Sequence, residues 1–261
     1  MTKVISLVNQ KGGVGKTTSS INLAAALGQL GKKTLIIDMD PQGNATTGLG
    51  YTSNDFDHDI YEGITGRCEI TKAIYKTKFK NLSLIPATIN LAGIDVEFIR
   101  QMTENPEFQR NYQLKNSLEE VKEKYDYIII DCQPSLGLCT MNALSASDSV
   151  IVPVQCEFLS LQGLALLLSS IIEVQQDMNP DLRIEGVLLT LFDGRTNIGL
   201  QVIEEVRRFF NDKVFNTIIP RLVRLAEAPS HGEPINEYDP QSRGAEAYRN
   251  LAKEVIERDG I

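Results

Sequence analysis

The chain has few histidine and cysteine side chains, which bind transition metals such as zinc. Its 261 residues include only two histidines and four cysteines, and the cysteines form no C-x-x-C pair. We therefore expect the cysteines to be small buried apolar residues in a reducing compartment, with a metal or cluster site as the alternative. The histidines have no partner pattern in the sequence and receive no catalytic role. These residues are His58, His231, Cys68, Cys132, Cys139 and Cys156.

Long apolar segments are also missing. No stretch reaches the roughly 18 consecutive apolar residues of a membrane span. The first apolar run ends at Val8, and the N-terminus lacks the charged, apolar and cleavage regions of a signal peptide. Both absences predict a cytoplasmic protein. The net charge of −8 argues against a polycationic coat for nucleic acids but leaves local basic patches open, and eight of the twelve arginines follow position 194.

The chain is rich in apolar runs that alternate with helical patterns. An Ala/Leu-rich stretch at 17–30, for example, ends before the cap glycine Gly31. Continuous apolar strands between helices indicate a mostly parallel, twisted sheet flanked by helices, with ligands at the carboxyl ends of the strands. We predict a single α/β domain over residues 1–261, irregular at 43–77, with strands at 4–8, 34–38, 82–85, 127–131, 149–152, 184–189 and 215–219.

A phosphate-binding loop follows the first expected strand. Residues 9–18 read Asn-Gln-Lys-Gly-Gly-Val-Gly-Lys-Thr-Thr and lead into a helix. Glycines allow backbone N–H groups to converge on phosphate oxygens, and the helix N-terminus adds its dipole and free donors. Lys16 would bridge the β- and γ-phosphates and the Thr17 hydroxyl would ligate Mg²⁺, so the string predicts a P-loop NTPase that uses ATP and Mg²⁺. The alternative is a glycine-rich turn before a helix.

One position departs from the G-x-x-x-x-G-K-[ST] template, because Gln10 stands where the first glycine is expected. Lys11 and two glycines follow it. Since Lys16 already serves the phosphates within the loop, a second ammonium on the outer rim needs another role. We expect Lys11 to act as a finger that neutralises charge on the transferred phosphoryl group, a contribution worth about 10³–10⁵ in rate. The alternative is an exposed rim lysine without a role.

Three aspartates stand at the ends of apolar strands. Asp38 and Asp40 are two residues apart, so they lie on the same face of a strand before Pro41 ends it. A strand-end acid beside the γ-phosphate can orient or activate the attacking water. Asp131 closes the run 127–130 as a Walker B aspartate does, where it would hold Mg²⁺, because an unpaired carboxylate there would be costly. A turn or helix-capping role for Asp40 is the alternative.

These motifs resemble those of the deviant Walker A class of ParA, MinD and nitrogenase iron proteins, and most closely its ParA/Soj branch. Residues 11–18 look like the deviant Walker A box, 38–46 like the second motif of the branch, and similar blocks continue at 131–137, 152–157 and 221–232. The resemblance implies a DNA-partitioning ATPase with slow basal turnover. Such a protein forms a homodimer around two ATP molecules, binds nonspecific double-stranded DNA in a nucleoid-associated state, and is released when a ParB/Spo0J-type activator protein stimulates hydrolysis.

The resemblance also assigns roles to residues. It places Lys11 at the partner subunit's nucleotide and gives Asp40 the attacking water. We expect Asp38 to support the site structurally, with a direct role at the water as the alternative. Gln133 replaces one proline of the family's Asp-x-Pro-Pro segment after Asp131. Gly12 and Gly13 would cradle phosphate and let two loops meet closely. The residues expected around the nucleotide are Lys11, Gly12, Gly13, Val14, Gly15, Lys16, Thr17, Thr18 and, at the adenine, Pro220.

A chain with a net charge of −8 can bind DNA only through a local basic patch. Arg195, Arg221 and Arg224 lie in segments resembling those that carry DNA contacts in the Soj branch. The alternative is that they are solvated or ion-paired surface residues, because acids lie among them in the sequence. Dimerisation would double the patch, and phosphate contacts would make binding salt-dependent and independent of sequence.

Three other classes share this loop or scaffold. A MinD-like membrane-cycling ATPase would need a basic amphipathic helix at its C-terminus, whereas residues 251–261 carry more acids than bases and no aromatic residue, so we expect no membrane partner. An iron–sulfur protein would use two cysteines per subunit. Cys132 and Cys139 flank the segment after Asp131, but Cys139 falls in an apolar helical stretch. A metabolic enzyme would need a second substrate pocket, for which no further acid–base cluster is visible.

Overall fold

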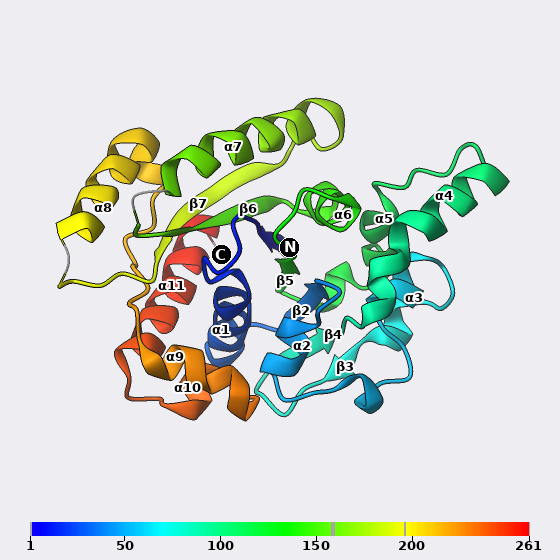
Figure 1. Ribbon diagram of the computed structural model, residues 1–261. Coiled ribbons are helices and arrows are strands. Elements are labelled where there is room, and N and C mark those ends of the chain that lie inside the picture. The colour runs from blue at the N-terminus through cyan, green and yellow to red at the C-terminus, as the bar shows by residue number, and fades with distance from the viewer. Residues whose placement is uncertain (1, 158–159, 196, 261) are drawn as a thin grey trace.

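A computed structural model of the chain describes residues 2–157, 160–195 and 197–260. Its centre is a seven-stranded sheet in the order β3-β4-β2-β5-β1-β6-β7 (Figure 1). Neighbouring strands run parallel except at one edge, where β3 pairs antiparallel with β4. The predicted mostly parallel sheet is therefore confirmed. The strands are β1 (Lys3–Leu7), β2 (Thr34–Met39), β3 (Tyr75–Lys76), β4 (Leu82–Ile85), β5 (Tyr127–Cys132), β6 (Ser149–Gln155) and β7 (Arg183–Thr190).

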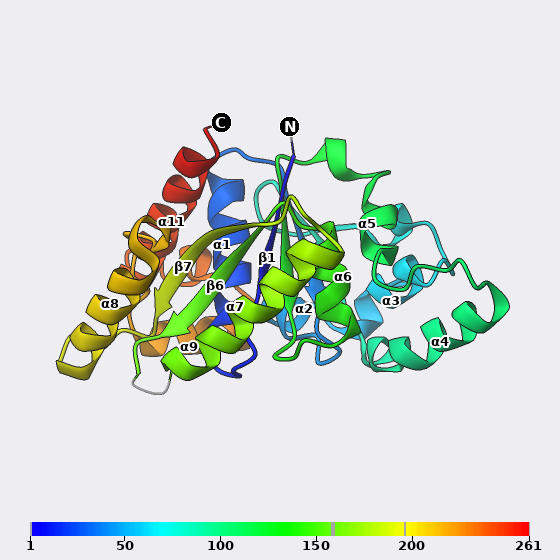
Figure 2. The same ribbon diagram turned by 90° about the horizontal axis from the view of Figure 1, so that it is seen from above.

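Helices cover both faces of the sheet, because its strands present apolar side chains alternately to two cores. Ile5 and Leu7 of β1 lie in one core with residues of α1 and α11, whereas Val4 lies in the other with residues of α6 and α7. Figures 1 and 2 show these two pairs of helices on opposite sides of the sheet. The helices are α1 (Lys16–Gln29), α2 (Asn44–Gly48), α3 (Ile60–Ile64), α4 (Ile94–Glu104), α5 (Gln113–Leu118), α6 (Leu138–Ala146), α7 (Ser160–Asp177), α8 (Asn197–Phe210), α9 (Val223–Glu227), α10 (Ile235–Tyr238) and α11 (Arg243–Asp259).

The register of the central strands brings the carboxyl ends of β1, β2 and β5 to the same end of the sheet. Leu7 of β1 and Asp38 of β2 both pair with Asp131 of β5. Every residue of β2 and β5 is buried, which explains their continuous apolar runs. The loop after β1 therefore lies at the same edge as these carboxylates. The chain termini lie at the other end of the sheet (Figure 2), where Lys3 Nζ and Asp259 Oδ1 are 2.8 Å apart.

One secondary-structure prediction was wrong, and another was right only in part. Residues 215–219 form no strand of the described sheet; they run beside β7, where the Phe215 and Ile219 N–H groups donate to carbonyls of that strand. The region 43–77 is irregular only in part, because it contains α2, α3 and β3. Short elements of this kind are stabilised by packing rather than by their own periodicity. Within the described ranges, no helix is both long and apolar enough to cross a membrane.

Candidate nucleotide site

The loop between β1 and α1 is shaped by two glycines in the left-handed region of backbone space. Gly13 has a φ of 73° and Gly15 a φ of 84°, so a side chain at either position would strain the backbone. Beneath the loop, the Thr190 hydroxyl donates to the Val14 carbonyl at 2.8 Å. The side-chain amide of Asn9 donates to a carbonyl of β6 at 2.7 Å. The loop is thus fastened to β6 and β7, and its outer face is left for other contacts.

Gly12 differs from these two glycines. A Cβ added at Gly12 would meet no heavy atom within 4 Å, and its φ lies outside the left-handed region. The fold of one subunit therefore does not require glycine here. The neighbouring Lys11 donates its N–H to Asn9 Oδ1 at 3.0 Å, whereas its ammonium has no carboxylate partner within the described part of the chain. This rim of the loop is free to meet a ligand or a second chain.

Lys16 turns back into the loop. Its residue is 6% exposed, and its Nζ donates to the Lys11 carbonyl at 3.2 Å. Burial lowers the pKa of Lys16, while the carboxylates of Asp131 and Asp40 oppose that shift. The ammonium has three donors, so it can bind phosphate oxygens in addition to this carbonyl.

Asp131 is fully buried at the end of β5, against the first turns of α1. Its Oδ1 accepts from the Ser20 hydroxyl at 2.8 Å, whereas its Oδ2 has no hydrogen-bond partner among the residues that the structure describes. Burial raises the pKa of Asp131, and the Asp38 carboxylate raises it further. A buried oxygen without a partner is costly, and a cation or its water shell would satisfy it. Oxygen ligands suit Mg²⁺, so Asp131 and the Thr17 hydroxyl fit that ion.

Asp38 holds the turn that carries Asp40. The Thr46 N–H and hydroxyl both donate to Asp38 Oδ2 at 2.8 Å, and the Asp40 N–H donates to Asp38 Oδ1 at 3.2 Å. The Asp40 carboxylate accepts from the Gln42 N–H at 2.9 Å and also lines the cavity above the loop. Asp38 therefore has a structural role, whereas Asp40 combines a turn contact with a position where it can face a ligand.

A cavity of about 690 Å³ lies over the loop and has the size of a small-molecule site. The loop and α1 form one wall, and the segments after β2 and β5 form the other. The structure brings together most of the predicted nucleotide-binding residues here, while Val14 is buried under the loop. The lining residues include Gly12, Gly13, Gly15, Lys16, Thr17, Thr18, Asp40, Gln133 and Pro134.

Pro220, expected at the adenine, lies outside this cavity. It lines a second cavity of about 510 Å³ between the segment that follows residue 215 and the start of α11. A parallel bridge to Phe192 places it just beyond the end of β7. The adenine contact of Pro220 stays a prediction.

The three arginines expected at DNA all have acidic partners. Exposed ion pairs contribute only about 0–1 kcal/mol, so a DNA phosphate could replace the acid in each pair. Their side chains are 88%, 50% and 58% exposed. In the single subunit they are ion-paired surface residues, which was the alternative that the sequence left open. By N···O distance the pairs are Arg195 with Asp193 at 2.6 Å, Arg221 with Glu157 at 2.8 Å and Arg224 with Glu227 at 3.5 Å.

Sequence reasoning missed the residues that support the site from below. Ser20 lies one helical turn after Lys16, and its hydroxyl contacts both the Lys16 carbonyl and Asp131. A serine inside a helix gives no sign of such a role. Thr190 and Thr46 reach the site through the fold, from β7 and α2, and neither lies in the phosphate-binding string.

A strand, a glycine-rich loop with a buried lysine, a helix, and a buried carboxylate on the neighbouring strand define a P-loop ATPase of the deviant Walker A class. Residues 2–184 match the family model described as an AAA domain. The chain is 56% identical to the sporulation initiation inhibitor protein Soj of Bacillus subtilis (strain 168) over 98% of both chains. It is 48% identical to the chromosome-partitioning ATPase Soj of Treponema pallidum (strain Nichols), over 100% of this chain and 99% of that protein. The chain belongs to the Soj/ParA family of chromosome-partitioning ATPases.

Solved structures agree with this assignment of the fold. Cobyrinic acid a,c-diamide synthase from Mycobacterium smegmatis, with bound ADP and magnesium, is 36% identical with a TM-score of 0.86, over 100% of this chain and 96% of that one. The septum site-determining protein MinD from Pyrococcus horikoshii OT3, complexed with Mg-ADP, is 28% identical with a TM-score of 0.76, over 100% and 98%. Nucleotide and magnesium in both neighbours agree with the expected cofactors, ATP and Mg²⁺.

Proposed function

We propose that the chain is an ATPase that dimerises with ATP and binds nonspecific double-stranded DNA as that dimer. The observation that carries the proposal is the outer rim of the loop. There the Lys11 ammonium lacks a carboxylate partner among the described residues, and Gly12 faces open space in its own subunit. A second subunit facing this rim would bring the two loops together and receive Lys11. The partition proteins among the relatives support the same reading.

The residues of the site would divide the work of hydrolysis. Bound Mg·ATP supplies the phosphoryl group and the cation that neutralises its oxygens. Lys16 holds phosphate oxygens, and Thr17 and Asp131 face the cation. Asp40 orients the attacking water and accepts its proton. Because Lys11 would act only across the dimer, a single subunit would turn over slowly.

DNA binding would use Arg195, Arg221 and Arg224. A few exposed arginines on one subunit provide few phosphate contacts, and nonspecific binding is weak, with a Kd on the order of 10⁻⁴–10⁻⁶ M. Dimerisation doubles the contacts, so the ATP-bound dimer binds where the subunit does not. A ParB/Spo0J-type activator that stimulates hydrolysis would then release the protein from a nucleoid-associated state.

A DNA-retention assay with ATP, with ADP and without nucleotide tests the proposal. We expect retention with ATP alone. Arg195→Glu and Arg224→Glu should still dimerise but lose DNA, whereas the matched charge reversal Lys76→Glu, on β3 at the other edge of the sheet, should retain it. Retention by both arginine variants would place the DNA site elsewhere, and equal retention in all nucleotide states would refute the ATP switch.

A MinD-like membrane-cycling role is the second candidate, because MinD of P. horikoshii shares the fold. That role requires a surface that binds lipids. Sedimentation with anionic liposomes in the presence of ATP separates the two candidates. We expect the protein to stay in the supernatant, and ATP-dependent pelleting would favour the membrane role.

A further inference from the structure

Three metal-ligating side chains of different types converge near α3, away from the nucleotide cavity. The candidate ligand atoms of His58, Glu62 and Cys68 all lie within 4.8 Å of one another. His58 Nδ1 and Glu62 Oε2 are 2.8 Å apart. All three residues are partly exposed, so an ion in solution can reach them.

Local structure brings these residues together. Asp59 caps the N-terminus of α3, where its carboxylate accepts from the Glu62 N–H at 3.1 Å. At the other end, Gly66 adopts a φ of 73°, and the Arg67 N–H donates back to the Glu62 carbonyl at 2.9 Å. This is the Schellman arrangement that reverses the chain after a helix. The Cys68 N–H donates to the same carbonyl at 3.3 Å, so Cys68 returns to the level of Glu62.

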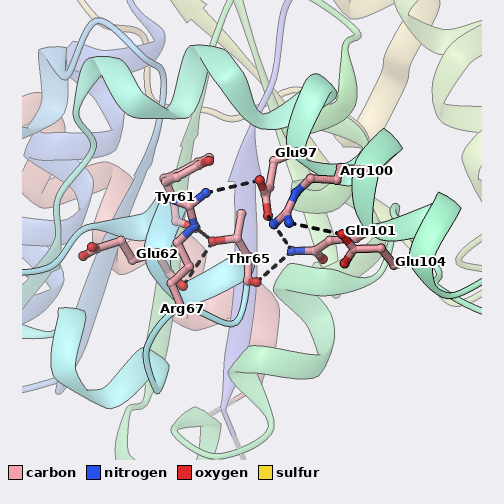
Figure 3. Close-up of polar contacts among 8 residues, drawn as sticks. All are labelled: Tyr61, Glu62, Thr65, Arg67, Glu97, Arg100, Gln101 and Glu104. Carbon is pink, nitrogen blue, oxygen red and sulfur yellow. Dashed lines mark hydrogen bonds and ion pairs between the residues drawn. The ribbon is translucent and has the colours of Figure 1, made fainter.

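A polar network on α4 holds that reversed segment in place. Figure 3 shows Arg67, Arg100 and Gln101 gathered around Glu97. Arg67 donates to Glu97 at 3.2 Å, and Gln101 donates to the Thr65 carbonyl at 2.9 Å. The segment 65–67 is therefore anchored on both sides before the chain reaches Cys68. This anchoring fixes the backbone that leads to Cys68.

We propose that His58, Glu62 and Cys68 form a zinc-binding site. Imidazole nitrogen, carboxylate oxygen and thiolate sulfur are the three ligand types that Zn²⁺ accepts. With bond lengths of about 2.0–2.3 Å, neighbouring ligands of a tetrahedral site lie about 3.3–3.7 Å apart. The His58–Glu62 separation of 2.8 Å is shorter than that range, the separations from Cys68 are at most 4.8 Å, and partly exposed side chains can adjust toward it.

The site would be open at its fourth position. Among the described residues, no fourth His, Cys, Asp or Glu joins the group, and the neighbouring Asp59 is buried and already accepts from Glu62 and from the Thr88 hydroxyl. Water would therefore complete the coordination, as in other zinc sites with three protein ligands. The bound ion would join the start of α3 to the segment after it and so stabilise the folded chain.

Titration of the untagged, chelator-treated full-length chain with Zn²⁺, in excess Mg²⁺ to occupy oxygen-only sites, tests the proposal. We expect one Zn²⁺ per chain by calorimetry. Cys68→Ser and His58→Gln should each weaken binding by at least about 10-fold, the loss that even an outer partner of a ligand typically causes. The matched controls Cys156→Ser and His231→Gln should bind as the original chain does.

Co²⁺ gives a second readout that does not depend on stability. A thiolate–Co²⁺ charge-transfer band should appear with the original chain and with Cys156→Ser, and be absent with Cys68→Ser. Far-ultraviolet circular dichroism verifies that each variant is folded. Absence of stoichiometric Zn²⁺ binding, or equal binding by Cys68→Ser and Cys156→Ser, would overturn the proposal.

Discussion

Replacing Thr46 with valine tests the reasoning about the carboxylates under the nucleotide site. Valine keeps the shape of threonine but removes its hydroxyl. Thr46 is 2% exposed, and its hydroxyl makes two hydrogen bonds. That hydroxyl donates to Asp38 Oδ2 at 2.8 Å and accepts from the Ala87 N–H at 3.1 Å. A lost bond to a charged group costs about 1.5–3 kcal/mol, and an unsatisfied buried N–H costs about 1–3 kcal/mol. We expect Thr46→Val to lower the free energy of unfolding by about 2–4 kcal/mol, because the two effects overlap in one residue.

The pH dependence of this loss separates it from a simple packing defect. Burial raises the pKa of Asp38, and the bonds from Thr46 oppose that shift. When a carboxyl has a higher pKa in the folded than in the unfolded chain, the free energy of unfolding falls as pH rises, because the folded chain must give up that proton. Removing the hydroxyl raises the folded pKa further. The difference between Thr46→Val and the original chain should therefore grow from about pH 5 to about pH 8.

Urea unfolding of the nucleotide-free chain at several pH values measures both effects. Thr47→Val is the matched control, because Thr47 is exposed and its hydroxyl contacts only carbonyls of its own turn. That control should change the free energy of unfolding by no more than about 0.5 kcal/mol. A Thr46→Val chain as stable as Thr47→Val, or one whose loss shrinks as pH rises, would refute the proposed role of Asp38.

Three further predictions concern the site itself. Gly12→Val should bind nucleotide normally but fail to form an ATP-dependent dimer in analytical ultracentrifugation, since a Cβ meets nothing within its own subunit; a normal dimer would remove the packing argument. Asp40→Ala should bind ATP and lose hydrolysis by at least about 100-fold in a phosphate-release assay, leaving a persistent dimer; normal turnover would exclude Asp40 as the residue that activates water. Because burial raises the pKa of Asp131 and a metal ligand must be charged, Mg²⁺-dependent ADP binding should release protons and weaken from about pH 8 to about pH 6. Asp38→Asn should move that weakening to lower pH, and calorimetry that shows no proton release would contradict the assignment.

Much of the fold could be predicted because strands buried on both faces appear in the sequence as runs of apolar residues. β2 and β5 are buried at every residue, and each contains an apolar run that ends at an aspartate, 35–37 before Asp38 and 127–130 before Asp131. The edge strands of the sheet could not be predicted as well. β3 has two residues and depends on β4 for its partner. The segment 215–219 contains Phe215, Ile218 and Ile219 but donates only part of its backbone to β7. Composition alone does not separate such a segment from a full strand.

The site could be predicted in part, for a different reason. The phosphate-binding string is continuous in sequence, so its residues are found together. The partners of the surface arginines are not, since Arg221 pairs with Glu157 from a distant segment. His58 and Cys68 likewise match no ligand-spacing motif, and only the chain reversal at Gly66 brings them together.

The two buried aspartates at the carboxyl ends of β2 and β5 are the exception to the apolar burial of the central strands. Asp38 and Asp131 pair in register on adjacent strands, where two charges without a cation repel each other. A proton can relieve that repulsion in the free subunit, and a cation can relieve it in the bound one, but the Asp131 oxygen cannot hold both. A metal held by Asp131, as proposed, would displace that proton, which would couple occupancy of the site to pH. An apolar strand that ends in Asp indicates where such a carboxylate stands, whereas the coupling follows only from the register that places two of them side by side.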